Sequence, residues 1–150
     1  MNSLARWVFA FMAALACAAG PVCGGDATAA IEARLIYGTN ADPKSAGGAA
    51  PELEPRLKRD FGYKHYRVLG EKSAKLKEGD GEKLELGQNF DISVKHKGTK
   101  KQFHTLGIDL YHQGKWLLFI EVSVKQRSEP IFIKGPWTED GLLIIALTAK

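Results

Sequence analysis

Cysteine is almost absent from this chain of 150 residues, which has only two, Cys17 and Cys23, both within its first 24 residues. Beyond them the sequence has no thiol nucleophile, no disulfide pair and no Cys-x-x-Cys redox or zinc motif. We therefore expect a fold held together by its apolar core alone.

Long apolar runs are also scarce. The one unbroken run, Trp7–Ala16, spans ten residues, whereas a membrane-spanning helix needs about 20. A short segment with one positive charge, Met1–Arg6, precedes this run, and small residues follow it. That order is typical of a secretory signal peptide. We expect a leader over residues 1–24, cleaved between residues 18 and 27, and a periplasmic or secreted protein. Lipid attachment through Cys17 is the alternative.

Catalytic and nucleotide-binding motifs are missing as well. There is no Gly-x-Ser-x-Gly nucleophile elbow. The only short glycine-rich turn, Gly79–Gly81, is followed by Glu82 rather than by a helix that begins with Lys-Ser or Lys-Thr. The sequence favours a protein that is not an enzyme and implies no cofactor.

Residues 25–150 are long enough for one domain with one core. Ile31–Tyr37 alternates apolar and polar residues, which predicts a strand. Pro51–Phe61 places three apolar residues on one helical stripe, which predicts a short helix beginning at Leu53 or later and ending at Gly62. The rest of the chain is typical of strands. We predict an α+β fold with a mainly antiparallel β-meander, curled or packed as a small sandwich or barrel.

The meander is best defined between residues 90 and 124, where three segments alternate in polarity. Matching their apolar faces predicts Val94 opposite Leu106 and His96 opposite His104. It also predicts a three-residue turn at His112–Gly114 and Trp116 on the apolar face. Short strands are expected over 63–69, 72–77, 82–86 and 131–134, and a loop over 135–141. The segment 142–147 is apolar at every position, so we expect a strand covered on both faces.

Candidate chemistry is sparse. His96 and His104, opposed across a hairpin, are weak candidates for a metal site because a third ligand is not evident. Asp91 and Asp109 are expected on the polar face of the meander, where a solvated surface is the simplest interpretation.

Two features suggest binding. Lys95, Lys97, Lys100 and Lys101 cluster at a predicted hairpin tip without an acidic residue among them. They would suit an anionic surface, or would protect a sheet edge. Trp137 lies in a predicted Gly-Pro loop, where it either folds over the core or marks a partner-binding spot.

Two short motifs carry a resemblance, Leu35–Asn40 (LIYGTN) and Phe61–Tyr66 (FGYKHY). In them the chain resembles small exported proteins of planctomycete or verrucomicrobial bacteria, in which a leader precedes a strand, a short helix, a strand and a β-rich tail. The resemblance implies bacterial export and this order of elements, and no activity.

The sequence thus predicts an exported, non-enzymatic binding or structural module of the cell envelope. Binding to an anionic surface, lipid or acidic polysaccharide, is one alternative, and a metal-assisted enzyme using His96 and His104 is another. The partner is expected to be an envelope protein or an anionic surface, not nucleic acid.

Overall fold

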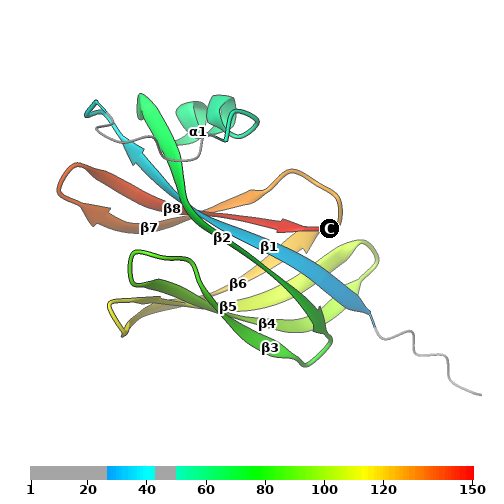
Figure 1. The fold of residues 1–150 in the computed structure, drawn as a ribbon. Coiled ribbons are helices and arrows are strands. Elements are labelled where there is room, and N and C mark those ends of the chain that lie inside the picture. The colour runs from blue at the N-terminus through cyan, green and yellow to red at the C-terminus, as the bar shows by residue number, and fades with distance from the viewer. Residues whose placement is uncertain (1–26, 43–49) are drawn as a thin grey trace, which may run out of the picture.

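Two four-stranded antiparallel sheets pack face to face in the computed structural model, which describes residues 27–42 and 50–150. The predicted leader and both cysteines lie outside the described residues. Sheet A has the order β2 (His65–Lys77), β1 (Thr28–Thr39), β8 (Gly141–Ala149), β7 (Ile131–Thr138). Sheet B has the order β3 (Gly81–Glu85), β4 (Phe90–Lys100), β5 (Phe103–His112), β6 (Lys115–Lys125) (Figure 1). This confirms the β-rich sandwich. The strands do not close into a barrel, so the barrel form of the prediction is not supported.

The main core lies between the two sheets and follows the alternation of the strands. Ile31 and Leu35 of β1 face Ile92, Ile108 and their neighbours in sheet B, and all four side chains are fully buried. Burial of this apolar surface, at about 25 cal/mol per Å², is the main stabilising contribution in a fold whose described part has no cysteine.

Strand β8 is covered on both faces, as its uninterrupted apolar sequence predicts. Ile145 and Leu147 point into the core between the sheets. Ile144 and Ala146 point to the opposite face, where a second, smaller apolar cluster forms under the helix.

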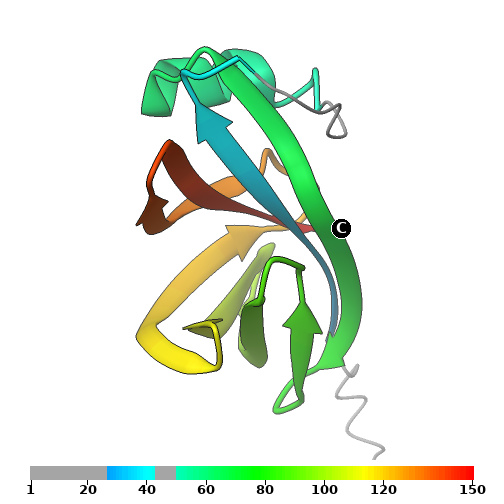
Figure 2. The ribbon, with the colours of Figure 1, turned by 60° about the vertical axis from the view of Figure 1, so that its left-hand side comes forward.

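The helix α1 (Glu54–Phe61) covers this second face of sheet A (Figure 2). Its buried anchor is Leu57. The helix ends at Gly62, whose φ of 76° is left-handed and whose amide donates to the carbonyl of Lys58 at 2.9 Å. Both the position and the glycine stop of the helix confirm the sequence prediction.

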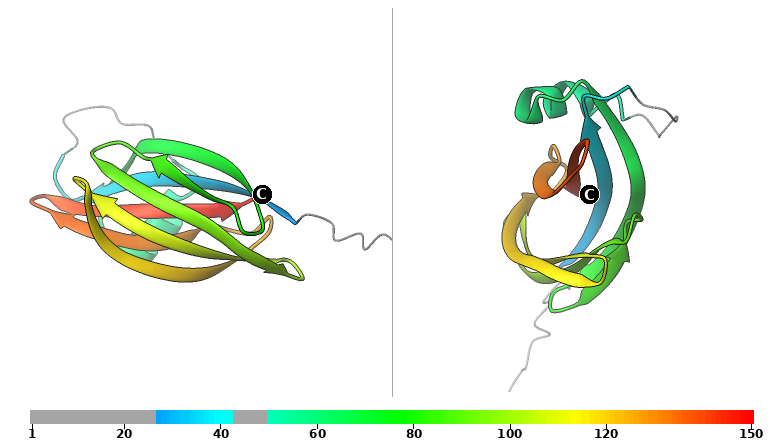
Figure 3. Two further views of the ribbon diagram at one scale, coloured as in Figure 1. Left: turned by 90° about the horizontal axis from the view of Figure 1, so that it is seen from below. Right: turned by 90° about the vertical axis from the view of Figure 1, so that its left-hand side faces the viewer.

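Two predicted boundaries are wrong. The segments 63–69 and 72–77 form one strand, β2, which curves along the sandwich and continues through a turn into β3 (Figure 3). Gly70 lies at its closest approach to sheet B, where an added Cβ would stand 1.8 Å from the carbonyl oxygen of Leu86. Strand β7 extends to Thr138, so part of the predicted 135–141 loop is strand, with Trp137 and Thr138 paired to β8.

The register of the meander differs from the prediction by two residues. Val94 pairs with Ile108, and His96 with Leu106. The β5–β6 turn has two residues, Gln113 and Gly114, whose φ values of 53° and 74° suit a tight hairpin turn. A shift of two residues leaves the regularly paired side chains on their predicted faces, so the apolar pattern alone does not distinguish the two registers. Trp116 is the exception: the alternation predicts it on the apolar face, and an irregularity in β6 places it on the outer face.

Candidate functional site

The four lysines predicted as a binding tip do lie together, along the end of β4 and its turn. All four are exposed. Lys95 points away from the core because its neighbours Val94 and His96 are buried. Lys97 forms an ion pair with Glu121 at 2.5 Å.

Trp137 is not part of this cluster. It pairs with Leu142 at the start of β8. The four lysines lie at the other end of the molecule, beside the end of β6. There Gln126, which follows β6, pairs with Ala149 at the end of β8. From Leu142 to Ala149 is about 23 Å along a strand.

Trp137 itself is 65% exposed, so it does not fold over the core. The ammonium of Lys134 stands over its ring, 4.4 Å from the ring centroid. Because both residues pair with residues of β8 that face the helix, Trp137 belongs to the outer side of sheet A.

A second group of exposed aromatic side chains lies on the outer face of sheet B, and the sequence did not predict it. Trp116 is 58% exposed and Phe119 is 48% exposed. We call Trp116, Phe119 and the half-buried Tyr111 the sheet B platform. Trp116 pairs across the strands with Tyr111, and Phe119 pairs with Asp109.

The platform is held in place by polar and cationic contacts. The indole Nε1 of Trp116 donates to the Asp109 carboxylate at 2.9 Å. Lys97 lies over Phe119, with its ammonium 5.3 Å from the ring centroid. Both side chains cross Gly107, where an added Cβ would meet the Phe119 ring at 3.1 Å and the Lys97 chain at 3.2 Å. The rings therefore lie across the sheet rather than extending freely into solvent.

Three of the carboxylates on this face are already engaged, and Glu85, which pairs across the strands with Asp91, is a further acidic residue there. Asp91 accepts from Lys83 at 2.9 Å, and this contact raises the pKa of Lys83. Glu121 is paired with Lys97, and Asp109 with Trp116. Asp91 and Asp109 are not directly opposed, since Asp91 pairs with Tyr111 and Asp109 with Ser93. The lysines Lys95, Lys100 and Lys101 form no ion pair with any described residue, so the uncompensated charge of this face is positive.

His96 and His104 do come together, although not directly opposite each other. A bulge at Lys97 allows His96, Thr99 and His104 all to face the core. His96 Nε2 lies 3.3 Å from His104 Nδ1, and the Thr99 hydroxyl lies 3.1 Å and 2.9 Å from these two atoms. Burial, and then the neighbouring His96, lowers the pKa of His104.

This histidine pair has no third ligand. Within residues 27–42 and 50–150 there is no group of three or more His, Cys, Asp and Glu residues arranged to hold a metal ion. The Thr99 hydroxyl instead provides each ring with a neutral hydrogen-bond partner. The other ring nitrogens, His96 Nδ1 and His104 Nε2, are buried and have no hydrogen-bond partner among the described residues.

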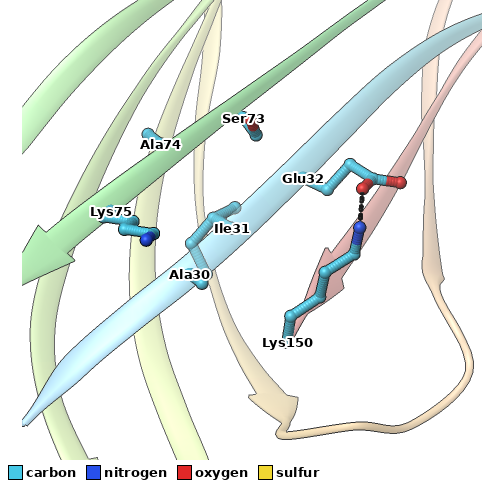
Figure 4. A pocket seen from close by; sticks show the side chains of 7 residues that line it. All are labelled: Ala30, Ile31, Glu32, Ser73, Ala74, Lys75 and Lys150. Atoms are coloured by element: carbon cyan, nitrogen blue, oxygen red, sulfur yellow. Dashed lines mark hydrogen bonds and ion pairs between the residues drawn. The ribbon is translucent and has the colours of Figure 1, made fainter.

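A shallow pocket on the outer side of sheet A is lined by Lys75, Lys150 and Glu32, and Glu32 compensates the charge of Lys150. Figure 4 shows Lys150 reaching across to the carboxylate of Glu32, with which it forms an ion pair. Glu32 also pairs with Arg34 at 2.9 Å, and Arg34 in turn contacts Glu52 and Glu71. This network joins the start of the helix segment to sheet A and is structural.

In the described part of the chain, no helix has the length and apolar character needed to cross a membrane. Comparisons with family models, with curated proteins and with solved structures give no match.

Proposed function

We propose that this protein is an exported, non-enzymatic module of the cell envelope that binds acidic polysaccharide on the outer face of sheet B. The observation that carries the proposal is the exposure of Trp116 and Phe119 near each other on the outer face of sheet B. Large aromatic rings left in solvent on one face are typical of a contact surface.

The spacing of the rings suits an extended chain of sugars. Their strand partners Tyr111 and Asp109 are two residues apart, which is about 7 Å along a strand. The face of a sugar ring that carries C–H groups is weakly positive and packs against the negative face of an aromatic ring. Two such rings in a row would hold successive sugar units.

The charge of the face favours an acidic polymer over a neutral one. Lys95 stands beside the platform, and Lys100 and Lys101 extend the positive surface at the β4–β5 turn. Asp91, Asp109 and Glu121 already have partners, and the exposed lysines of this face outnumber its remaining acids, Glu78 and Glu85, so we expect a ligand carboxylate to meet more cations than acids. Binding should weaken as salt rises, because exposed charges are screened.

Support for export comes from the order of charged, apolar and small residues over 1–24. Fractionation of the native cells, followed by N-terminal sequencing of the purified protein, tests it. An envelope protein beginning between residues 19 and 28 is expected. A cytoplasmic protein that retains Met1 would contradict export.

Retention in native gels that contain polysaccharide tests the binding proposal. Polygalacturonate and alginate should retard the protein, and dextran should not. Trp116→Ala and Phe119→Ala should each weaken retention about tenfold, which corresponds to roughly 1.4 kcal/mol. Lys95→Gln should weaken it less and reduce its dependence on salt.

Trp137→Ala is the matched control, because it removes an equally exposed tryptophan from sheet A. It should bind like the unaltered protein. The proposal fails if no acidic polysaccharide retards the protein. It also fails if Trp137→Ala abolishes binding while Trp116→Ala does not, or if anionic lipid vesicles bind the protein and acidic polysaccharides do not.

A further inference from the structure

Phe103 is a further exposed aromatic residue on the outer face of sheet B, and it is not part of the platform. It is the first residue of β5 and is 45% exposed. The next residue, His104, is buried on the core side, so the alternation of the strand directs Phe103 outward. In the described part of the chain no cation and no second ring stacks on Phe103. Its ring is therefore more open to a ligand than that of Phe119, which lies under Lys97.

Two lysines flank Phe103 on the same face of the sheet. Phe103 pairs with Lys100 across the β4–β5 hairpin and with Lys125 of β6. Side chains of directly paired residues leave a sheet on the same side, with Cβ atoms about 4.5–5.5 Å apart. Lys101 is exposed in the adjoining turn. Within the described ranges these three lysines form no ion pair, so positive charge lies on both sides of the ring.

The acidic residues at this end of sheet B do not cancel that charge. Glu121 is already paired with Lys97. Glu78 lies beside Gly98 of β4, where its carboxylate oxygen is 3.4 Å from the position of an added Cβ. Strand β5 separates β4 from Lys125. Both carboxylates therefore leave the side of Phe103 that faces Lys125 uncompensated.

Short polar side chains lie between the platform and Phe103. Thr105 is the outward residue next to Phe103 along β5, and it pairs with Ser123 of β6. Hydroxyl side chains both donate to and accept from the hydroxyls of a sugar. Asp109, the strand partner of Phe119, is six residues from Phe103, which is about 20 Å along a strand. The face thus carries exposed rings at two places with a low polar strip between them.

Hydrogen bonds hold the Phe103 end of the sheet together. The amide of Gln126 donates to the carbonyl of Gln102 at 2.8 Å, which joins the chain after β6 to the β4–β5 turn. The Ser128 hydroxyl donates to the carbonyl of Lys125 at 2.8 Å. The backbone that carries Phe103 and Lys125 is therefore already ordered, which lowers the entropic cost of binding there.

We infer that Phe103, Lys100 and Lys125 form a second contact for the acidic polysaccharide, and that the ligand lies along β5 from the sheet B platform to the β4–β5 turn. The inference rests on the proposed function and adds the length of the ligand and its direction on the sheet. One sugar ring packs on Phe103, and the carboxylates beside it meet the two lysines. A short oligomer reaches one contact at a time, whereas a longer oligomer spans both and gains from the second within the same complex.

Isothermal titration of the purified protein with an oligogalacturonate trimer and a nonamer tests the inference. The nonamer should bind the unaltered protein more tightly than the trimer by about tenfold or more. Phe103→Ala should weaken binding of the nonamer about tenfold and change binding of the trimer by less than about twofold. Trp116→Ala should weaken binding of both oligomers, because it removes a ring of the platform.

Lys125→Gln is a second variant that does not alter an aromatic side chain. It should weaken binding of the nonamer several-fold and reduce its dependence on salt. Lys72→Gln is the matched control, because Lys72 is also an exposed strand lysine and pairs with Ala33 in sheet A. It should bind both oligomers like the unaltered protein. Thermal unfolding of each variant, followed in parallel, should stay close to that of the unaltered protein.

The outcomes separate this inference from the proposed function. The inference alone is overturned if Phe103→Ala and Lys125→Gln bind the nonamer with unchanged affinity while Trp116→Ala loses it. It is also overturned if these two variants lose binding only to vesicles that contain phosphatidylglycerol, since this end would then be a lipid contact. If neither oligomer binds the unaltered protein, the proposed function fails and the inference fails with it.

Discussion

Acidification should destabilise this protein through its buried histidine pair. His104 is 4% exposed and lies against His96, which is fully buried. Burial and the neighbouring ring lower the pKa of His104, so the folded protein favours the neutral ring. As the pH falls, the unfolded chain therefore takes up this proton before the folded protein does.

The sign and size of the effect follow from that difference. The stability that the lowered pKa of His104 contributes to the folded protein is present in full above the ordinary histidine pKa of about 6.5. It is lost as the pH falls from there through the lowered pKa of folded His104. While folded His104 stays neutral, the slope of the free energy of unfolding increases from about 0.7 kcal/mol per pH unit at pH 6.5 toward about 1.4 kcal/mol per pH unit at lower pH, as the unfolded histidine becomes fully protonated. Between pH 6.5 and 5.5 the carboxylates remain largely ionised, so this window isolates the histidines.

Urea unfolding at a series of pH values from 7.5 to 5.5 measures this slope. His104→Gln keeps a hydrogen-bonding side chain beside Thr99 but does not titrate. It should be less stable at pH 7.5 and should show a clearly flatter dependence on pH. His65→Gln is the control, since His65 is partly exposed on β2 and lies 3.9 Å from Asp42. The reasoning is refuted if His104→Gln keeps the full slope, or if His65→Gln removes it.

Two further predictions concern the packing of the fold and are measured by urea unfolding. Leu57→Ala truncates the fully buried anchor of α1 and should lower the free energy of unfolding by about 2–4 kcal/mol. The control Lys58→Ala, at an exposed position, should change it by less than about 1 kcal/mol. Equal effects of the two variants would mean that the helix is not docked. Gly70→Ala puts a Cβ 1.8 Å from the Leu86 carbonyl oxygen and should lower the free energy of unfolding by about 3 kcal/mol or prevent folding. The control Gly62→Asn has open space and a left-handed φ that Asn accepts, so it should lower the free energy by less than about 1 kcal/mol. A stable Gly70→Ala would refute the close approach of β2 to Leu86.

The elements of this fold that sequence predicts best are those fixed by local patterns. Leu53, Leu57 and Phe61 follow the period of a helix, and Gly62 supplies its left-handed stop, so α1 could be placed within a residue or two. The segment 142–147 has apolar residues on both sides of a strand, and β8 is covered on both faces. In each case the information lies within a dozen residues.

The register of the meander could not be obtained in the same way. Shifting one strand by two residues keeps Val94 and Ile108 on the core side and changes only which residues pair. The choice depends on turn geometry, and Gln113 does not belong to the residues that typically mark a two-residue turn.

The sheet B platform depends on one irregularity in β6 that the alternation of apolar and polar residues in the sequence does not reveal. Counting back from Leu118 in steps of two places Trp116 on the core side of β6. In the structure Leu117 is an extra residue, because Leu118 pairs with Leu110 while Trp116 pairs with its neighbour Tyr111. This bulge turns Trp116 to the outer face, where its indole reaches Asp109. Bulges re-aim side chains in this way beside functional sites. If Leu117 took a regular place in the pairing instead of bulging out, Trp116 would point toward the core, so Trp116 joins the aromatic surface only because the strand is irregular at that point.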